Sequence, residues 1–321
     1  MTARTPSHSR GGPRDRAVAL AAGFACDRLL ADPRRWHPVA GFGVAAGQLE
    51  RLLWRRTRLA GIGYAATLVA VPASTAMLAE RLLALRPHLL GVYRAAAIWV
   101  TLGGRSLELA ALHLAHALEQ GDIAQARKLA PTLVGRDPRD LDGNELSRAA
   151  VESVAENTSD AVVAPLLWAG LLGVPGAAAY RAVNTLDAMV GHKDERHLRF
   201  GWAAARLDDL ANWPAARLTA LLAVLAAPLV GGDPRAAWHA AFHDGRAHPS
   251  PNAGRVEGAF AGALGIRLGG LNRYRHGAEL RATLGQGPAP TVLDIDRAVR
   301  LARLVDVTAL VLCVALARRR R

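Results

Sequence analysis

Residues 59–79 read LAGIGYAATLVAVPASTAMLA and contain no charged side chain. A run of about 20 apolar residues is long enough to cross the hydrocarbon core of a bilayer as a helix, and Pro72 is tolerated in such a helix. A second charge-free run covers residues 161–180. Weaker candidates, each interrupted by at least one charge, cover residues 89–104, 214–232 and 301–317. Because no strand-like alternation accompanies these runs, we predict an all-α, polytopic helical membrane protein.

The charged residues lie in segments of their own between the apolar runs. The 321 residues include 40 Lys and Arg against 27 Asp and Glu, which gives a formal net charge of +13. No helix-turn-helix, RRM or zinc-finger spacing accompanies this charge, so no nucleic-acid partner is expected. A basic surface would instead suit the anionic lipid of a bilayer, or a substrate that carries phosphate and carboxylate groups.

A single helical, membrane-embedded domain is expected over residues 17–317. Residues 1–16 contain two prolines, two glycines and four arginines, a composition typical of a disordered basic leader. Residues 318–321 are all Arg and form a basic C-terminal tail. Such a cluster favours a cytoplasmic C-terminus in the cell membrane, and we expect the helical polar segments to form a site that faces the cytoplasm.

The number of membrane crossings is left open by the sequence. If every apolar run crossed the bilayer, the polar segments 127–160, 181–212 and 239–281 would face opposite sides in turn. Irregular or short segments at membrane depth are tolerated only where they are buried in protein. For the three polar segments to form one site, at least one apolar run should therefore be re-entrant or buried in the protein.

The polar segment that begins near residue 184 gathers oxygen-bearing side chains. Asn184, Asp187, Gly191 and Asp194 recur at three, four and three residues, so on a helix they would share one face. The next segment adds Asp208, Asp209 and Asn212. Carboxylates gathered in this way suit a hard cation such as Mg²⁺. The alternative is a solvated polar loop that joins two helices.

Two further segments carry candidate site residues. Glu145, Glu152, Glu156 and Asp160 recur at helical intervals, and such like charges destabilise a helix unless a cation, an Arg or open water offsets them. Residues 248–254 contain two prolines and a glycine, which make a stiff loop. Because this loop presents an imidazole, a hydroxyl and a carboxamide, we interpret it as a binding loop.

Together these segments form six motifs in order along residues 17–317. They are Asp27-x4-Asp32-Pro33 with His37-Pro38-Val39, Gly135-Arg136-Asp137, Glu152-Ser-Val-Ala-Glu156-Asn157-Thr158-Ser159-Asp160, Asn184-Thr-Leu-Asp187-x-Met189-Val190-Gly191-His192, Arg206-Leu-Asp208-Asp209-x2-Asn212-Trp213 and His248-Pro-Ser250-Pro-Asn252-Ala-Gly254. This set resembles the CobD/CbiB family, the adenosylcobinamide-phosphate synthases of cobalamin biosynthesis. Two positions depart from the usual pattern: Arg255-Val256 stands where an aromatic residue and Pro are common, and Ala161 stands where Gly is common.

The resemblance implies an integral membrane ligase that depends on ATP and Mg²⁺. Such an enzyme joins the free propionate carboxylate of the corrinoid adenosylcobyric acid to aminopropanol phosphate, or to a related amino-alcohol phosphate, and forms adenosylcobinamide phosphate. Contact with other enzymes of the cobalamin pathway would be compatible with this role.

We assign roles in this reaction from the residue types. Mg²⁺ would be bound by Asp187, Asp208 and Asp209, with Glu152 and Glu156 as further candidates. The candidate catalytic residues are His248 and His192, either of which could accept the proton of the attacking amine, together with Lys193 and Glu156. The expected substrate-binding residues are Asp27, Asp32, His37, Arg136, Asn157, Asp160, Asn184, Arg206, Asn212, Ser250 and Asn252. Lys193, Arg136 and Arg206 would hold phosphate oxygens, and the four Asn would orient the amides of the corrin rim.

Three other classes of protein remain open at this point. A polytopic prenyltransferase also binds Mg²⁺ and diphosphate through Asn- and Asp-rich helices. A membrane transporter would use acids at membrane depth to line a path for its solute. A non-catalytic scaffold for other pathway enzymes is the third class, although it would leave the polar motifs without a purpose.

Overall fold

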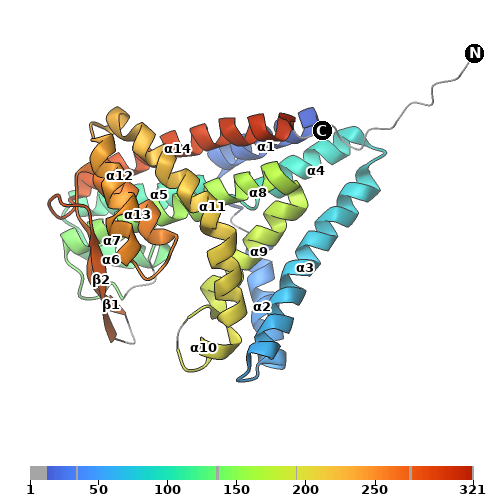
Figure 1. The fold of residues 1–321 in the computed structure, drawn as a ribbon, viewed down its shortest axis with the longest axis horizontal. Helices are drawn as coiled ribbons and strands as arrows, with labels where there is room; N and C mark the ends of the chain where they lie inside the picture. The colour runs from blue at the N-terminus through green and yellow to red at the C-terminus, as the bar shows by residue number, and fades with distance from the viewer. Residues whose placement is uncertain (1–12, 34, 135–136, 193, 275–276, 320–321) are drawn as a thin grey trace, which may run out of the picture.

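A computed structural model of the chain describes residues 13–319, apart from 34, 135–136, 193 and 275–276. Nearly all of this part is helical (Figure 1), which confirms the predicted all-α class. The sequence pattern missed one antiparallel hairpin, β1 (Leu268–Tyr274) and β2 (Gly277–Leu284). Its first strand contains Gly269 and Gly270 at positive φ and an irregularity in the pairing, so the two-residue alternation that identifies a strand is weak there.

The helices follow one another along the chain, and the β1–β2 hairpin lies between the last two, α13 and α14. They are α1 (Pro13–Leu30), α2 (Pro38–Leu53), α3 (Arg58–Leu83), α4 (Pro87–Trp99), α5 (Gly104–Glu119), α6 (Ile123–Leu129), η1 (Ala130–Thr132), α7 (Gly143–Thr158), η2 (Ser159–Val163), α8 (Ala164–Leu172), α9 (Val174–Val190), α10 (His197–Phe200), α11 (Trp202–Ala226), η3 (Ala227–Val230), α12 (Pro234–Phe242), η4 (Asp244–Ala247), α13 (Ala253–Leu264) and α14 (Val292–Arg319).

The two ends of the domain differ slightly from the expected boundaries. Helix α1 begins at Pro13, so residues 13–16 of the expected leader are helical, with Pro at a position where its missing N–H is not needed. At the other end α14 continues through Arg319, so the first residues of the expected tail are helical as well. Residues 1–12 and 320–321 lie outside the described part of the chain.

Three helical segments in the described part of the chain are long and apolar enough to cross a membrane. They are Arg58–Leu83, Pro87–Glu119 and Trp202–Val230. They contain the predicted runs 59–79 and 89–104 and all but the last two residues of the run 214–232. The run 301–317 lies in α14, which is not among them within the described residues. These spans, in a chain that is helical almost throughout, agree with a polytopic membrane protein.

The charge-free run 161–180 does not form one continuous helix. It is divided at Gly173, whose φ of +74° ends α8 and starts α9. Helix α8 continues from α7 through η2 without a break, so the helical part of the run before Gly173 is residues 161–172. These residues rise only about 18 Å, well short of the hydrocarbon thickness. Helices α8 and α9 therefore form a hairpin within the protein, with Leu166 and Ala177 fully buried. This hairpin brings the two ends of the run together, where the Tyr180 hydroxyl lies 3.0 Å from the backbone oxygen of Asp160.

Small residues allow the helices around the α9–α11 segment to approach one another closely. A Cβ added to Gly61 of α3 would lie 1.8 Å from the backbone oxygen of Phe200, and one added to Gly201 would lie 1.6 Å from that of Val190. Tyr64 packs against Phe200 in the same buried cluster. Helix α3 and the end of α9 are thus held against the segment that starts α11, as is typical of membrane helices with small residues at their contacts.

Candidate functional site

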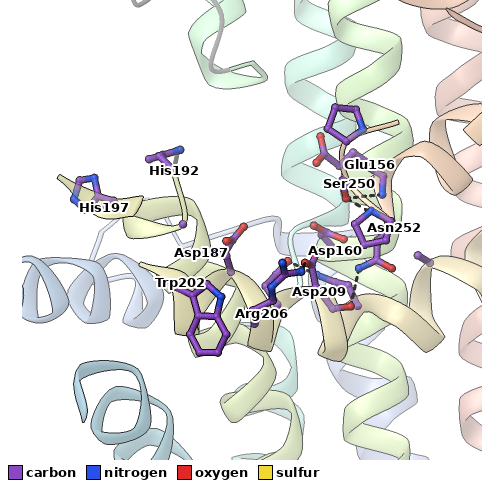
Figure 2. Close-up of a pocket in the computed structure, with 18 of the residues that line it drawn as sticks. Glu156, Asp160, Asp187, His192, His197, Trp202, Arg206, Asp209, Ser250 and Asn252 are labelled. Carbon is purple, nitrogen blue, oxygen red and sulfur yellow. Dashed lines mark hydrogen bonds and ion pairs between the residues drawn. The ribbon is translucent and has the colours of Figure 1, made fainter. Parts of the chain in front are cut away.

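A pocket of about 740 Å³ lies between η2, the C-terminal end of α9, the first half of α11 and the loop that precedes α13. Five carboxylates line it: Glu156, Asp160, Asp187, Asp208 and Asp209. Figure 2 shows Asp160, Asp209, Ser250 and Asn252 together at one end, His192 and His197 at the other, and Asp187 between them. Four of the six sequence motifs therefore meet in one cavity.

The four acids predicted to form one stripe on α7 do not stay together. Glu145 forms a capping box in the first turn of α7. Glu152 is buried, and its carboxylate accepts a hydrogen bond of 2.8 Å from the backbone N–H of Gly269. Only Glu156 and Asp160 line the pocket. The chain passes through a π-helical turn, η2, which changes the phase of the side chains and is a feature often found at functional sites.

Amide side chains hold two of the carboxylates in place. Asn184 Nδ2 lies 3.4 Å from both Asp160 Oδ2 and Asp208 Oδ1, and Asn212 Nδ2 donates to Asp208 Oδ2 at 3.0 Å. The hydroxyl of Tyr180 donates to Asn212 Oδ1 at 2.7 Å and so fixes the orientation of that amide. Asn184 and Asn212, which we expected to orient substrate amides, are engaged with protein carboxylates. Outer partners of this kind are what position metal ligands.

The loop at 248–254 forms one wall of the pocket. The side chain of Asn252 donates to the backbone oxygen of Asp209 at 2.8 Å and accepts from Arg217 at 2.6 Å. Ser250 Oγ accepts from the backbone N–H groups of Asn252 and Ala253 at 3.3 and 3.1 Å. These bonds fasten the loop to α11, with Ser250 and Asn252 facing the cavity. The prediction of a stiff loop at this position agrees with the geometry.

His248 stands behind this wall, away from the cavity. Only 8% of the residue is exposed, and it is not among the residues that line the pocket. Its Nδ1 accepts from the backbone N–H of Ser250 at 3.1 Å, and its Nε2 lies 3.9 Å from Glu257 Oε1. The structure thus places His248, an expected catalytic residue, behind the loop and in contact with its backbone, and not at the cavity. His192, the other expected proton acceptor, is exposed in the pocket.

The crowded carboxylates are electrostatically unfavourable without a cation. Burial raises the pKa of Asp187 to about 6, and the charges of Asp209 and Glu156 contribute to the rise. Burial, followed by the charges of Asp208 and Glu156, raises the pKa of Asp160 well above its ordinary value. Like charges that share a site raise one another's pKa in this way. Because oxygen ligands in such a cluster suit a hard divalent cation, this donor set fits Mg²⁺.

The opposite end of the pocket is basic and aromatic. Arg58, Arg199 and Trp202 line it, and the Arg58 guanidinium lies 5.0 Å from the centre of the Trp202 ring. His197 is held by Asp194, whose carboxylate lies 2.9 Å from its Nδ1. The spacing predicted that Asp194 shares a helix face with Asn184 and Asp187. Asp194 instead lies beyond the end of α9, so this prediction is wrong. Guanidinium groups placed here can bind phosphate oxygens by their paired N–H donors.

Sequence reasoning missed Arg58, Arg199, Trp202 and His197 as pocket residues. Arg58 stands directly before the apolar run 59–79, a position that reads as an ordinary membrane-flanking charge. His197 and Arg199 belong to α10 and Trp202 is the first residue of α11. Only the folding of this segment against α3 brings all three into the pocket. No spacing in the sequence relates Arg58 to Trp202.

Four expected substrate-binding residues lie away from the pocket. Asp27 is fully buried and accepts from the backbone N–H of Arg105 at 3.2 Å, in a separate charged cluster between α1, α5 and α14. Asp32 lies 3.6 Å from His37 Nε2, and His37 Nδ1 caps α2. Asn157 donates to a backbone oxygen of its own helix at 2.9 Å. Arg136 and Lys193, two further predicted site residues, lie outside the described residues. Arg206 lies in the pocket, where its guanidinium is 3.3 Å from Asp209 Oδ2.

Residues 20–302 match the family described as CobD/Cbib protein. A relative from Mycobacterium tuberculosis, Cobalamin biosynthesis protein CobD, is 50% identical over 306 residues, which cover 95% of this chain and 97% of the relative. Relatives of the same name are 47% identical in Geobacter metallireducens (85% and 87% covered) and 38% identical in Halalkalibacterium halodurans (88% and 91% covered). No solved structure matches the chain.

Proposed function

The chain belongs to the CobD/CbiB family of cobalamin-biosynthesis proteins, and on this premise we propose that it is an ATP- and Mg²⁺-dependent amide ligase. It would join the free propionate of adenosylcobyric acid to aminopropanol phosphate, or a related amino-alcohol phosphate, and release adenosylcobinamide phosphate. One observation carries the proposal: five carboxylates share a pocket with three arginines, Arg58, Arg199 and Arg206. That combination suits a substrate set with several phosphates and a divalent cation.

The acidic end of the pocket would hold the cation. Asp187, Asp208 and Asp209 are the proposed ligands, and Asn184 and Asn212 keep the Asp208 carboxylate in position. When bound there, Mg²⁺ would neutralise charge on the phosphates and orient them. Glu152, an earlier candidate ligand, is omitted because its carboxylate binds the Gly269 backbone in another part of the fold.

The proposed chemistry has two steps. An oxygen of the propionate attacks the γ-phosphorus of ATP, which forms an acyl phosphate and releases ADP. The amine then attacks the acyl carbon, the C–O bond to phosphate breaks, and inorganic phosphate and one proton leave. The arginines would position and neutralise phosphate oxygens in both steps. His192, which faces the pocket, is the proposed acceptor of the amine proton.

We place the pocket on the cytoplasmic side of the cell membrane. ATP is supplied from that side, and the C-terminal helix ends in Arg318 and Arg319, which favour the cytoplasm. A protease-protection assay on sealed vesicles would test this orientation. Protection of the C-terminus in right-side-out vesicles is expected.

Reconstitution of the reaction tests the proposed activity. Purified protein would be incubated with adenosylcobyric acid, ATP, Mg²⁺ and either aminopropanol phosphate or threonine phosphate. The mass of the corrinoid product would then be measured by mass spectrometry. We expect one product, whose mass equals the sum of the masses of the acid and the amine less that of one water. One ADP should form for each molecule of this product. The variant Asp187→Asn should form none, whereas Glu195→Gln, at an exposed surface ion pair, should keep full activity.

The same preparation separates the rival classes. Consumption of a prenyl diphosphate without amide product would indicate a prenyltransferase. Uptake of a corrinoid into proteoliposomes without ADP formation would indicate a transporter. Either result would overturn the ligase assignment.

A further inference from the structure

A second group of metal-ligating side chains lies outside the pocket, where α12 meets η4. His239 lies in the last turn of α12, His243 is the residue that caps the C-terminus of this helix, and Asp244 follows at the start of η4. Among the described residues, one ligand atom from each of these three side chains lies within 4.8 Å of the other two. None of the six sequence motifs contains these residues.

Both imidazoles are turned toward the same carboxylate oxygen. Nδ1 of His239 lies 3.6 Å, and Nδ1 of His243 lies 3.1 Å, from Asp244 Oδ1. The two rings are stacked, with centroids 4.5 Å apart. The second oxygen, Asp244 Oδ2, accepts a hydrogen bond of 3.1 Å from the backbone N–H of Gly285, just after β2. An outer hydrogen bond that fixes a carboxylate in this way is typical of a metal ligand.

A simpler account would be a helix end stabilised by histidine. A protonated His near a helix C-terminus interacts favourably with the helix dipole. A single imidazole would be enough for that role, however. The helix-dipole account also does not explain why two rings converge on one oxygen of a carboxylate that already accepts a backbone hydrogen bond. Convergence of two nitrogen donors and one oxygen donor is the arrangement that a three-residue metal site requires.

We propose that His239, His243 and Asp244 form a binding site for a borderline divalent metal ion of the Zn²⁺ class. Imidazole nitrogens suit Zn²⁺, Ni²⁺ and Cu²⁺, whereas Mg²⁺ prefers oxygen ligands throughout. The site is therefore distinct in chemistry from the acidic pocket. With 53% and 74% of their side chains exposed, His239 and His243 are accessible to an ion from solvent, and water would complete a tetrahedral set.

The position of the site indicates what a bound ion would do. Asp244 connects α12 to the end of β2 through Gly285, and η4 leads directly into the loop at 248–254. An ion held by all three side chains would fasten these elements together and stiffen the start of the loop that walls the pocket. The inference stands on this cluster alone and does not depend on the proposed ligase activity.

Metal binding by the complete, tag-free protein in detergent tests the proposal. After treatment with EDTA and its removal, the protein would be titrated with Zn²⁺ by calorimetry and by competition with a chromophoric chelator. One Zn²⁺ per chain is expected. His239→Ala and His243→Ala should each weaken binding by at least about tenfold, the loss that even outer partners of a metal site produce. Asp244→Asn, which keeps an acceptor for Gly285, should also weaken binding.

The chain contains a matched control in the exposed pair His113 and His116 of α5. Replacing both with Ala removes two surface imidazoles at i, i+3 and should leave Zn²⁺ affinity unchanged. Thermal unfolding without metal would show that the α12 variants fold like the wild type. Equal Zn²⁺ affinity in the wild type and in a His239→Ala/His243→Ala double variant would overturn the proposal, as would a loss of binding only in the α5 control.

Discussion

Replacing Asp187 with Asn should make the metal-free protein more stable while it abolishes the proposed activity. The two side chains have nearly the same shape, so the substitution removes a negative charge and little else. In the wild type this carboxyl is enclosed with the carboxylates of Asp209 and Glu156, and its pKa is raised from 3.8 to about 6. The charged form therefore opposes folding whenever no cation compensates it.

The magnitude follows from the pKa. A rise from 3.8 to about 6 corresponds to about 3 kcal/mol, and screening by solvent at this partly exposed side chain reduces the expected gain to between about 1 and 3 kcal/mol. A carboxyl with a higher pKa in the folded state destabilises that state once it ionises. The penalty is absent below the unfolded pKa of 3.8 and complete above about 6.

Thermal unfolding in detergent, followed by tryptophan fluorescence, measures this difference. In EDTA at pH 8 the Asp187→Asn variant should unfold at a higher temperature than the wild type, and the two should converge at pH 4. Saturating Mg²⁺ at pH 8 should stabilise the wild type by about 1.4 kcal/mol for each tenfold excess over its dissociation constant, and the variant by much less. Glu195→Gln, which removes an exposed charge, should show neither effect.

A different outcome would contradict the electrostatic account of the pocket. If Asp187→Asn is no more stable than Glu195→Gln at pH 8 in EDTA, the carboxylates do not repel one another in the folded protein. If the variant responds to Mg²⁺ as the wild type does, Asp187 is not a ligand. Loss of activity alone would not distinguish these cases, and for that reason stability is the primary measurement.

Three further predictions concern the walls of the pocket. Gly201→Ala should destabilise the protein by about 1–3 kcal/mol, because the new Cβ would lie 1.6 Å from a backbone oxygen of α9. Gly63→Ala, where no heavy atom lies within 4 Å of the new Cβ, should not destabilise it, and chemical denaturation of both variants compares the two sites. His192→Gln should lower kcat and leave KM nearly unchanged, whereas His248→Gln should raise KM and leave kcat nearly unchanged. An unchanged KM in the His248 variant would remove its role in the loop. Arg206→Ala should raise the KM of the phosphorylated amine by about tenfold, the loss of one charge-assisted contact, and an equal KM for both proteins in steady-state assays would exclude contact with phosphate.

Much of this protein is decided by local sequence. Runs of apolar residues such as 59–79 specify helices of membrane-spanning length, because burial in lipid depends on composition and length alone. The helical spacing of Asn184 and Asp187 likewise places both at the same end of α9, and two prolines stiffen the loop at 248–254. We predicted the convergence of these segments from their chemistry, because carboxylates and amides from several motifs can form a metal and phosphate site only if they lie close together.

Only the tertiary structure decided which residues meet and what each of them contacts. Whether the run 161–180 forms one helix depended on a break at Gly173, which composition does not reveal. Asn212 is engaged by a carboxylate, His248 lies behind its loop, and Arg58 reaches Trp202 from a distant helix. Each of these outcomes is set by the packing of segments far apart in the chain, where differences of a few ångströms determine whether a polar group faces the cavity or another protein atom.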